Sequence, residues 1–334
     1  MTGRTRRTAK ASSVKLSFDG VLRRHRLLEG EMVKIGSSAS IMNFLKLEYV
    51  REHGPEALIP RRRRPFPPAA IRAILQLQGV LVGGRLLSPG SLWSETVKGL
   101  VCFCAETGSR KSEVSLPEVS SSFDRSRLTR SNLRFVTSTG QRLDDPTRDQ
   151  LLLMKDGSYV TVRPCASKTD RHGEKWGNHS MYLDYSTTAD ICTARHLVNM
   201  ELLNPCRGVM RQHTPLFSLG VSGQHLHHAL MDKMLVDLLS FVPASCLGHE
   251  LRDNLSWHSF RVYLACALKA MQVGDDDICA MCRWSTKEAL KIYARWEPSN
   301  YIALLRSARS VMSLDSFAVG SEPAVDDNEL FAAA

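Results

Sequence analysis

The chain has 334 residues, 43% of them hydrophobic and 23% charged, and its 44 Lys and Arg against 34 Asp and Glu leave a net charge of +10. This composition is typical of a globular protein with one large or two ordinary domains. The basic excess fits either a polyanionic partner such as nucleic acid or a role in solubility. No apolar run approaches the ~20 residues that a bilayer crossing needs, which excludes a membrane-spanning protein. The basic start lacks the apolar core of a secretory signal, which argues against export.

The nine cysteines are an odd number without disulfide-like spacing, which indicates a reducing compartment. We expect an intracellular location, in the nucleus, the nucleoid or an organelle. Cys279 and Cys282 have the spacing of half a zinc site, but no second pair follows them. His225, His227 and His228 are expected to cap a helix or to face DNA rather than to hold a metal. We therefore expect no metal and no cofactor.

The first segment, residues 1–62, is expected to combine a basic arm with a short, truncated helical DNA-binding segment, whose helix stops at Gly54-Pro55. The run Arg61, Arg62, Arg63 and Arg64 follows, and we expect it to lie either in solvent or along a phosphate backbone. Residues 63–312 form the main domain. Residues 313–334 are acidic and are expected to be disordered or to dock elsewhere.

Within the main domain, a new helix is expected at about Pro68, and a Ser-capped helix is expected from about Ser91 to Thr107-Gly108. Three short segments rich in β-branched and aromatic residues, 133–138, 157–165 and 180–185, predict strands, with Lys168 in the loop between the last two. Helices are predicted to dominate from Thr187 onward. The predicted fold is mostly α with a small antiparallel β-sheet, an α+β class.

A series of residues near the C-terminus has a regular spacing. His258 and Arg261 are three residues apart on one face of a predicted helix that Asn254 or Ser256 can cap, Trp284 lies 23 residues after Arg261, and Tyr293 lies nine after Trp284. This order resembles the C-terminal signature of the tyrosine recombinases, the phage integrase family. On its own helix, with a capping box at Ser285–Glu288, Tyr293 reads as a packed core residue, but its spacing from Trp284 favours a nucleophile.

Two upstream segments strengthen the resemblance. "AETGSRKSEV" is similar to a box of the family, which implies that Arg110 is its first catalytic arginine and Glu113 the acidic companion. "ASKTDRHGEKWGNHSMYL" resembles the hairpin that carries the family's catalytic lysine, with Lys168 in the expected place and Lys175 as the alternative. The resemblance implies an integrase-like catalytic domain over residues 63–312.

The resemblance also implies a function: site-specific breakage and rejoining of double-stranded DNA through a 3′-phosphotyrosine, without metal or ATP, in an assembly that is typically a tetramer. Arginines stabilise the added phosphate charge, Trp284 donates its indole N–H, His258 is the candidate base and Lys168 the general acid. The rivals are a type IB topoisomerase, which usually has Lys in place of His258, and a transposon-derived DNA-binding protein that has lost catalysis.

The sequence departs from the family pattern at several points. Arg110 and Lys168 are 58 residues apart, which is wide, and "CRW" at Cys282–Trp284 replaces a common "LGH" and so removes a glycine. Only about sixty residues precede the main domain, fewer than the family's usual N-terminal clamp. The cysteine content and the "WHSFR" box are similar to recombinases of eukaryotic mobile elements, the crypton and DIRS-like branches.

Overall fold

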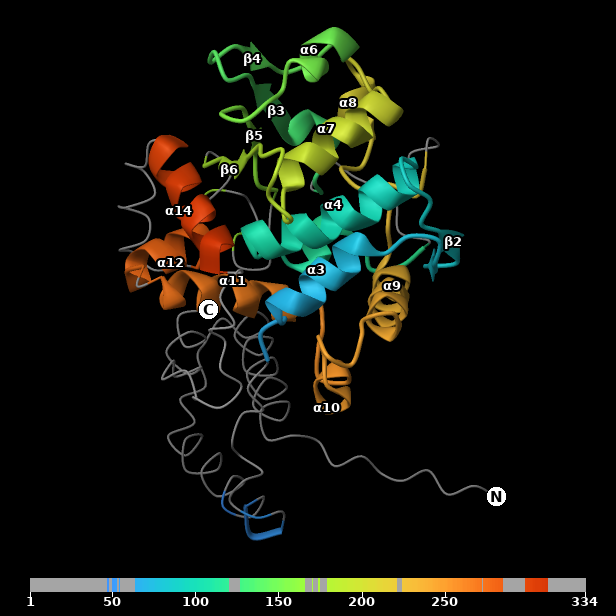
Figure 1. Cartoon of the computed structure of the whole chain (residues 1–334), viewed down its shortest axis with the longest axis vertical. Helices are drawn as coiled ribbons and strands as arrows, with labels where there is room; N and C mark the ends of the chain where they lie inside the picture. The colour runs from blue at the N-terminus through green and yellow to red at the C-terminus, as the bar shows by residue number, and fades with distance from the viewer. Residues whose placement is uncertain are drawn as a thin grey trace, which may run out of the picture. The chain divides into compact units, whose positions relative to one another are not determined.

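The structure is a computed structural model of the chain, and it describes residues 64–119, 127–165, 179–220, 224–271, 273–284 and 298–311, together with positions 47, 50–52, 54, 170 and 174. The chain divides into two units, Met1–Arg62 and Arg63–Ala334, so the boundary falls inside the basic run of Arg61–Arg64. The helices and strands named below all belong to the second unit (Figure 1). The roles predicted for the two outer segments stay predictions.

The described part of the second unit is mainly helical. Its helices are α3 (Pro68–Gln76), α4 (Leu92–Thr107), α5 (Lys111–Val114), α6 (Arg148–Leu152), α7 (Thr193–Leu203), α8 (Met210–His213), α9 (His228–Ser240), α10 (His249–Arg252), α11 (His258–Ala270), α12 (Asp275–Met281) and α14 (Pro298–Val311), with the 3-10 helix η2 (Arg130–Asn132). Its strands are β1 (Leu81–Val82), β2 (Arg85–Leu86), β3 (Leu133–Val136), β4 (Arg142–Leu143), β5 (Tyr159–Val162) and β6 (Met181–Asp184). The arrangement is therefore α+β, with small antiparallel sheets.

The larger sheet contains the three strands that the sequence predicts. Its order is β4-β3-β5-β6, all antiparallel, and Val160 of β5 faces Phe135 of β3 and Leu183 of β6. These three side chains are buried, which is why the β-branched and aromatic pattern predicts the strands. The connection between β5 and β6 is the one predicted to hold Lys168, but Lys168 itself lies outside the described residues.

Helix α4 forms the centre of the unit, and its predicted bounds are confirmed. The Ser91 side chain accepts from the N–H of Ser94 at the start, and Gly108 ends the helix in the left-handed conformation with φ 58°. Five consecutive residues, 100–104, are fully buried, so the helix is covered on all sides. It packs against α7 and α11, and a Cβ on Gly99 would lie only 3.1 Å from the Cβ of His196.

A second, smaller apolar cluster joins α11, α12 and α14. It includes Leu264 and Leu268 from α11, Ile278 from α12, and Leu305 and Ala308 from α14. In Figure 1 these three helices lie together on the side of the unit where β6 forms the edge of the larger sheet. No helix in the described ranges is long and apolar enough to cross a membrane.

Candidate functional site

The structure describes about half of the predicted site residues. Arg64, Arg110, Glu113, His258, Arg261 and Trp284 are described, whereas Arg61–Arg63, Lys168, Lys175 and Tyr293 lie outside the described residues. The contacts below therefore concern the predicted phosphate-binding side chains and not the predicted nucleophile or general acid.

Arg110 lies in the turn that joins α4 to the single-turn helix α5. The N–H of Glu113 donates to the Arg110 carbonyl at 2.9 Å, and this turn brings the two side chains together. The Nη1 of Arg110 lies 3.3 Å from Oε1 of Glu113, with the Arg110 side chain 22% exposed and the Glu113 side chain 6% exposed. The Arg110 side chain is thus partly exposed, whereas the carboxylate that it binds is buried.

Arg261 projects from α11 onto the end of α4. Its guanidinium is buried, and Nη1 donates to the carbonyl of Gly108 at 2.7 Å while Nη2 donates to the carbonyl of Cys282. A Cβ on Gly108 would lie 3.3 Å from Cγ of Arg261, so glycine serves both the left-handed turn and the close contact. Two segments that are 153 residues apart therefore meet at one hydrogen bond.

Trp284 completes the contacts around Arg261. The Cζ atom of Arg261 lies 5.7 Å from the centre of the Trp284 ring, which is within the range of a cation–π contact. The turn after α12 holds the tryptophan in place, since its backbone N–H donates to Cys279 at 2.8 Å. The ring is half-buried.

His258 occupies the first position of α11, one turn before Arg261, and is half-buried. The predicted helix start is close to the observed one, and the N–H of Ser256 donates to Oγ of Ser259 at 3.1 Å. Phe66 also donates its N–H to the Ser259 carbonyl, at 3.1 Å. The exposed Arg64 lies two residues before Phe66, so the end of the basic run leads to the first turn of α11.

Arg283 was not among the predicted site residues. Its guanidinium is buried, and Nη2 lies 2.6 Å from Oε2 of Glu113 and 3.2 Å from Oγ of Ser109. Within the described residues, it is the one non-glycine residue with a positive φ, at 55°. The sequence does not show that the Arg283 side chain turns inward to Glu113.

The charges of this cluster shift the pKa values of Glu113 and Arg261. Burial raises the pKa of Glu113, but Arg283, Arg261 and Arg110 outweigh burial and hold the pKa below the ordinary value of 4.5. The pKa of Arg261 is lowered to about 10, mainly by burial and in part by Arg110 and Arg283, although Cys282 and Glu113 act in the opposite direction. At neutral pH the cluster thus holds three protonated guanidinium groups around one carboxylate, which leaves an excess of positive charge for an anionic ligand.

A second set of ion pairs attaches α14 to the rest of the unit. Arg309 donates from Nε to Oε1 of Glu106 at 2.6 Å and from Nη1 to Oδ2 of Asp184 at 3.0 Å. Arg306 also binds Asp184, at 2.7 Å. Glu106 lies in the last turn of α4, just before the turn that carries Arg110. The helix that follows the predicted nucleophile in sequence is therefore held on the same framework as the arginine cluster.

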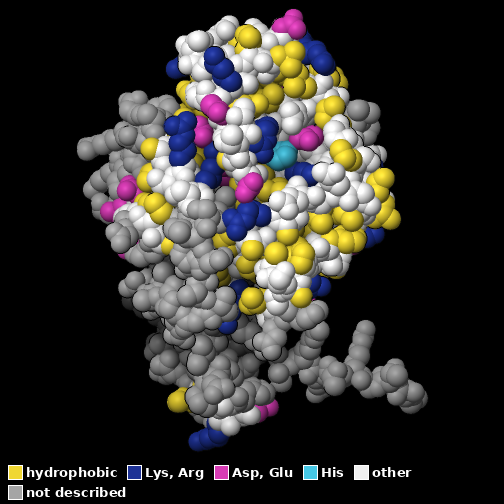
Figure 2. All heavy atoms as spheres, viewed as in Figure 1, with side chains coloured by type: hydrophobic (Ala, Val, Ile, Leu, Met, Phe, Trp, Pro, Cys, Tyr) yellow, Lys and Arg dark blue, Asp and Glu magenta, His cyan; other side chains and the backbone are white. Residues whose placement is uncertain are grey.

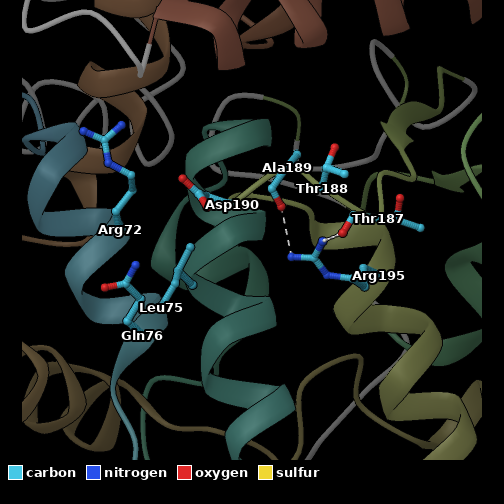
Figure 3. A pocket seen from close by; sticks show the side chains of 8 residues that line it. All are labelled: Arg72, Leu75, Gln76, Thr187, Thr188, Ala189, Asp190 and Arg195. Carbon is cyan, nitrogen blue, oxygen red and sulfur yellow. Dashed lines mark hydrogen bonds between the residues drawn. The ribbon is translucent and has the colours of Figure 1, made fainter.

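A cavity lies elsewhere, between α3 and the chain that leads into α7. Its volume is about 310 Å³, and Figure 3 shows Arg72 and Gln76 from α3 opposite Arg195 from α7. Arg195 donates to the carbonyls of Thr187 and Ala189 at 3.2 and 3.0 Å, so its guanidinium fixes this loop. No predicted site residue lines the cavity.

The histidines and cysteines considered as metal ligands have other surroundings. His227 caps α9, as predicted, because its Nδ1 accepts from the N–H of Leu230 at 3.2 Å. All nine cysteines are described and none forms a disulfide, and burial raises the pKa of the Cys282 thiol to about 11. In the described part of the chain, no three His, Cys, Asp or Glu side chains are grouped as metal ligands.

The surface seen in Figure 2 has basic and acidic side chains next to each other across its centre, with apolar side chains toward one edge. The overall excess of positive charge is therefore not concentrated into an unbroken basic area on this face. Compared with protein-family models, with curated proteins and with solved structures, the chain matches none.

Proposed function

We propose that the protein cuts and rejoins double-stranded DNA as a tyrosine recombinase, with Tyr293 as its nucleophile. The observation that supports this most is the meeting of three distant segments: Gly108 and Arg261 share a hydrogen bond, and the Trp284 ring lies against the same guanidinium. The resemblance assigns these segments to one phosphate site, and Arg110, Arg261 and Arg283 all act on the buried carboxylate of Glu113.

The proposed role of the cluster is to bind the phosphate that is cut. A phosphodiester is already anionic, and attack by a phenolate adds charge to its non-bridging oxygens, so fixed cations lower the barrier. Arg110 has the exposure to reach such a phosphate. Arg261 uses two of its N–H groups for backbone carbonyls, and a guanidinium carries five. The Trp284 indole N–H donates without adding charge.

In the proposed reaction, the Tyr293 oxygen attacks phosphorus, and the bond from phosphorus to the 5′ oxygen breaks. A free phenol has a pKa of about 10, so the phenol needs a base, and His258 is our candidate for accepting its proton. Lys168 is proposed to protonate the departing 5′ oxygen. The product is a 3′-phosphotyrosine and a free 5′-hydroxyl. Attack by a 5′-hydroxyl reverses these steps, so that no ATP or metal is required.

A nicked duplex that loses its short 5′-hydroxyl fragment after cleavage tests this proposal. Wild type is expected to accumulate a covalent protein–DNA adduct, and Tyr293→Phe to form none. Tyr301→Phe, eight residues away, is the matched control and is expected to behave as wild type. Wild type without an adduct would contradict the enzyme and favour a protein that only binds DNA. Relaxation of supercoils by monomers without a preferred sequence would favour a type IB topoisomerase.

A further inference from the structure

The backbone of Arg283 has a conformation that is costly for any residue with a side chain. Its φ of 55° is in the left-handed region, which favours glycine. The residue is nevertheless an arginine, and its guanidinium is directed inward, with 4% of the residue exposed. A buried cation in a strained turn calls for a compensating interaction.

That interaction is with the turn that carries Arg110. Arg283 donates from Nη2 to Oε2 of Glu113 at 2.6 Å and to Oγ of Ser109 at 3.2 Å, and its Nη1 contacts the sulfur of Met181. The three partners come from α5, from the loop before it and from β6. Arg283 therefore joins the turn after α12 to the Arg110 turn and to the larger sheet.

The two oxygens of Glu113 are divided between two arginines. Oε2 lies 2.6 Å from Arg283, whereas Oε1 lies 3.3 Å from Arg110. The shorter contact belongs to the more buried arginine, and of the three arginines that lower the pKa of Glu113, Arg283 has the largest Coulombic effect. Without it, the buried carboxylate would have Arg110 as its nearest cation, and Arg110 would move toward Glu113 because a buried charge without a close partner is costly.

We propose that Arg283 is a positioning residue, which neutralises Glu113 from the inside and thereby leaves the Arg110 guanidinium directed toward an external phosphate. This inference deepens the proposed function, on which it rests, by adding a residue outside the predicted site. Arg283 does not touch the phosphate itself. It acts through Glu113, on the position and the available donors of Arg110.

Three variants separate this role from a general effect on folding. Arg283→Gln removes the neutralising charge and leaves Glu113 bound to Arg110. Glu113→Gln combined with Arg283→Gln loses one anion and one cation, so the cluster keeps the net charge of wild type. Arg283→Gly also removes the charge but relaxes the left-handed turn, and is expected to be more stable than Arg283→Gln. If Arg283→Gln and Arg283→Gly lose activity alike although their stabilities differ, the loss of activity does not result from a loss of stability.

The first measurement is the rate of adduct formation on the nicked duplex at saturating DNA. Arg283→Gln and Arg283→Gly are expected to react about 100-fold more slowly than wild type, because displaced catalytic groups cost rates of this order. The double variant is expected to recover most of the loss. Wild-type rates in Arg283→Gln, or a double variant as slow as Arg283→Gln, would overturn the proposal.

The second measurement does not depend on DNA cleavage. The melting temperature of each full-length variant is followed as inorganic phosphate replaces chloride at constant ionic strength. Phosphate is expected to raise the melting temperature of wild type more than that of Arg110→Ala. Arg283→Gln is expected to show the same small rise as Arg110→Ala, and the double variant the larger rise of wild type. If wild type forms no adduct but this pattern holds, the recombinase proposal fails and the role of Arg283 stands. Equal rises in the melting temperatures of wild type, Arg110→Ala and Arg283→Gln would overturn the proposed role of Arg283.

Discussion

The Nη1 of Arg261 donates to the carbonyl oxygen of Gly108 over 2.7 Å, although the two residues are 153 positions apart in the chain. The contact is close because Gly108 has no side chain: a Cβ there would meet both Cγ and Cα of Arg261, at 3.3 and 3.7 Å. The end of α4 and the first turns of α11 are thus fitted to each other, and both predicted phosphate-binding arginines depend on this fit.

Gly108→Ala is therefore expected to lower the free energy of unfolding by more than the cost of the left-handed conformation alone. The left-handed conformation alone costs an alanine about 1–2 kcal/mol, and the contact with Arg261 adds to it. Gly140→Ala is the matched control, because Gly140 has φ 83° and nothing within 4 Å of its Cβ position. Urea unfolding should show a larger loss for Gly108→Ala, and equal losses would mean that the contact with Arg261 is unimportant.

Arg110→Ala and Arg261→Ala are both expected to reduce DNA cleavage about 100-fold or more while weakening DNA binding much less, since each removes a cation that we propose to stabilise the transition state. Their effects on stability should differ. Arg261→Ala leaves the Gly108 and Cys282 carbonyls without their donor, at about 1–3 kcal/mol each, whereas Arg110 is partly exposed. Equal losses of binding and cleavage would mean that the arginines only hold DNA.

The acid stability of the protein is expected to depend on Glu113. Burial raises its pKa, but Arg283, Arg261 and Arg110 hold it below 4.5, so the unfolded chain takes up a proton at a higher pH than the folded protein. The stability that this carboxylate contributes is complete above the unfolded pKa and is lost as the pH falls through the folded pKa. Wild type should therefore lose stability in acid more steeply than Glu113→Gln, as measured by urea unfolding from pH 6 downward, to about pH 3. Parallel curves for the two proteins would contradict the charged state of Glu113, and Glu118→Gln on exposed chain serves as the control.

Helix α14 provides a pair of arginines for a matched comparison. Arg309 binds Glu106 and Asp184 with 9% of its side chain exposed, whereas Arg306 binds Asp184 with 57% exposed. Removing one partner of a buried pair costs about 3–5 kcal/mol, and an exposed pair contributes about 0–1 kcal/mol. Arg309→Leu should thus destabilise the protein and accelerate hydrogen exchange in α14 far more than Arg306→Leu. Similar effects of the two variants would show that Arg309 does not hold the helix.

Local signals in the sequence were sufficient for several elements. Ser91 and Gly108 predict both ends of α4, and the β-branched segments predict β3, β5 and β6, because caps and strand patterns act over a few residues. The hairpin of β1 and β2 was missed, although its Gly83-Gly84 pair is a turn signal, with φ of 61° and 80°. The strand β4 and helix α6 were also missed, and both are very short.

In the candidate site, too, short motifs predict some residues, whereas contacts between distant segments could not be predicted. Arg110, His258 and Arg261 were predicted from short motifs that resemble those of the family, and these roles stay predictions, whereas the ion pair of Arg283 with Glu113 joins residues that are 170 positions apart. No periodicity in the sequence reports such a contact. The inward turn of Arg283 also depends on a left-handed backbone that glycine, and not arginine, would signal.

The most direct test of the central claim is the identity of the residue that becomes attached to DNA. The adduct trapped with the nicked duplex is digested with protease and nuclease, and the peptide that carries a nucleotide is sequenced by mass spectrometry. The account predicts a 3′-phosphoryl nucleotide on Tyr293. A nucleotide on Tyr301 or any other residue, or linkage through a 5′ phosphate, would contradict it.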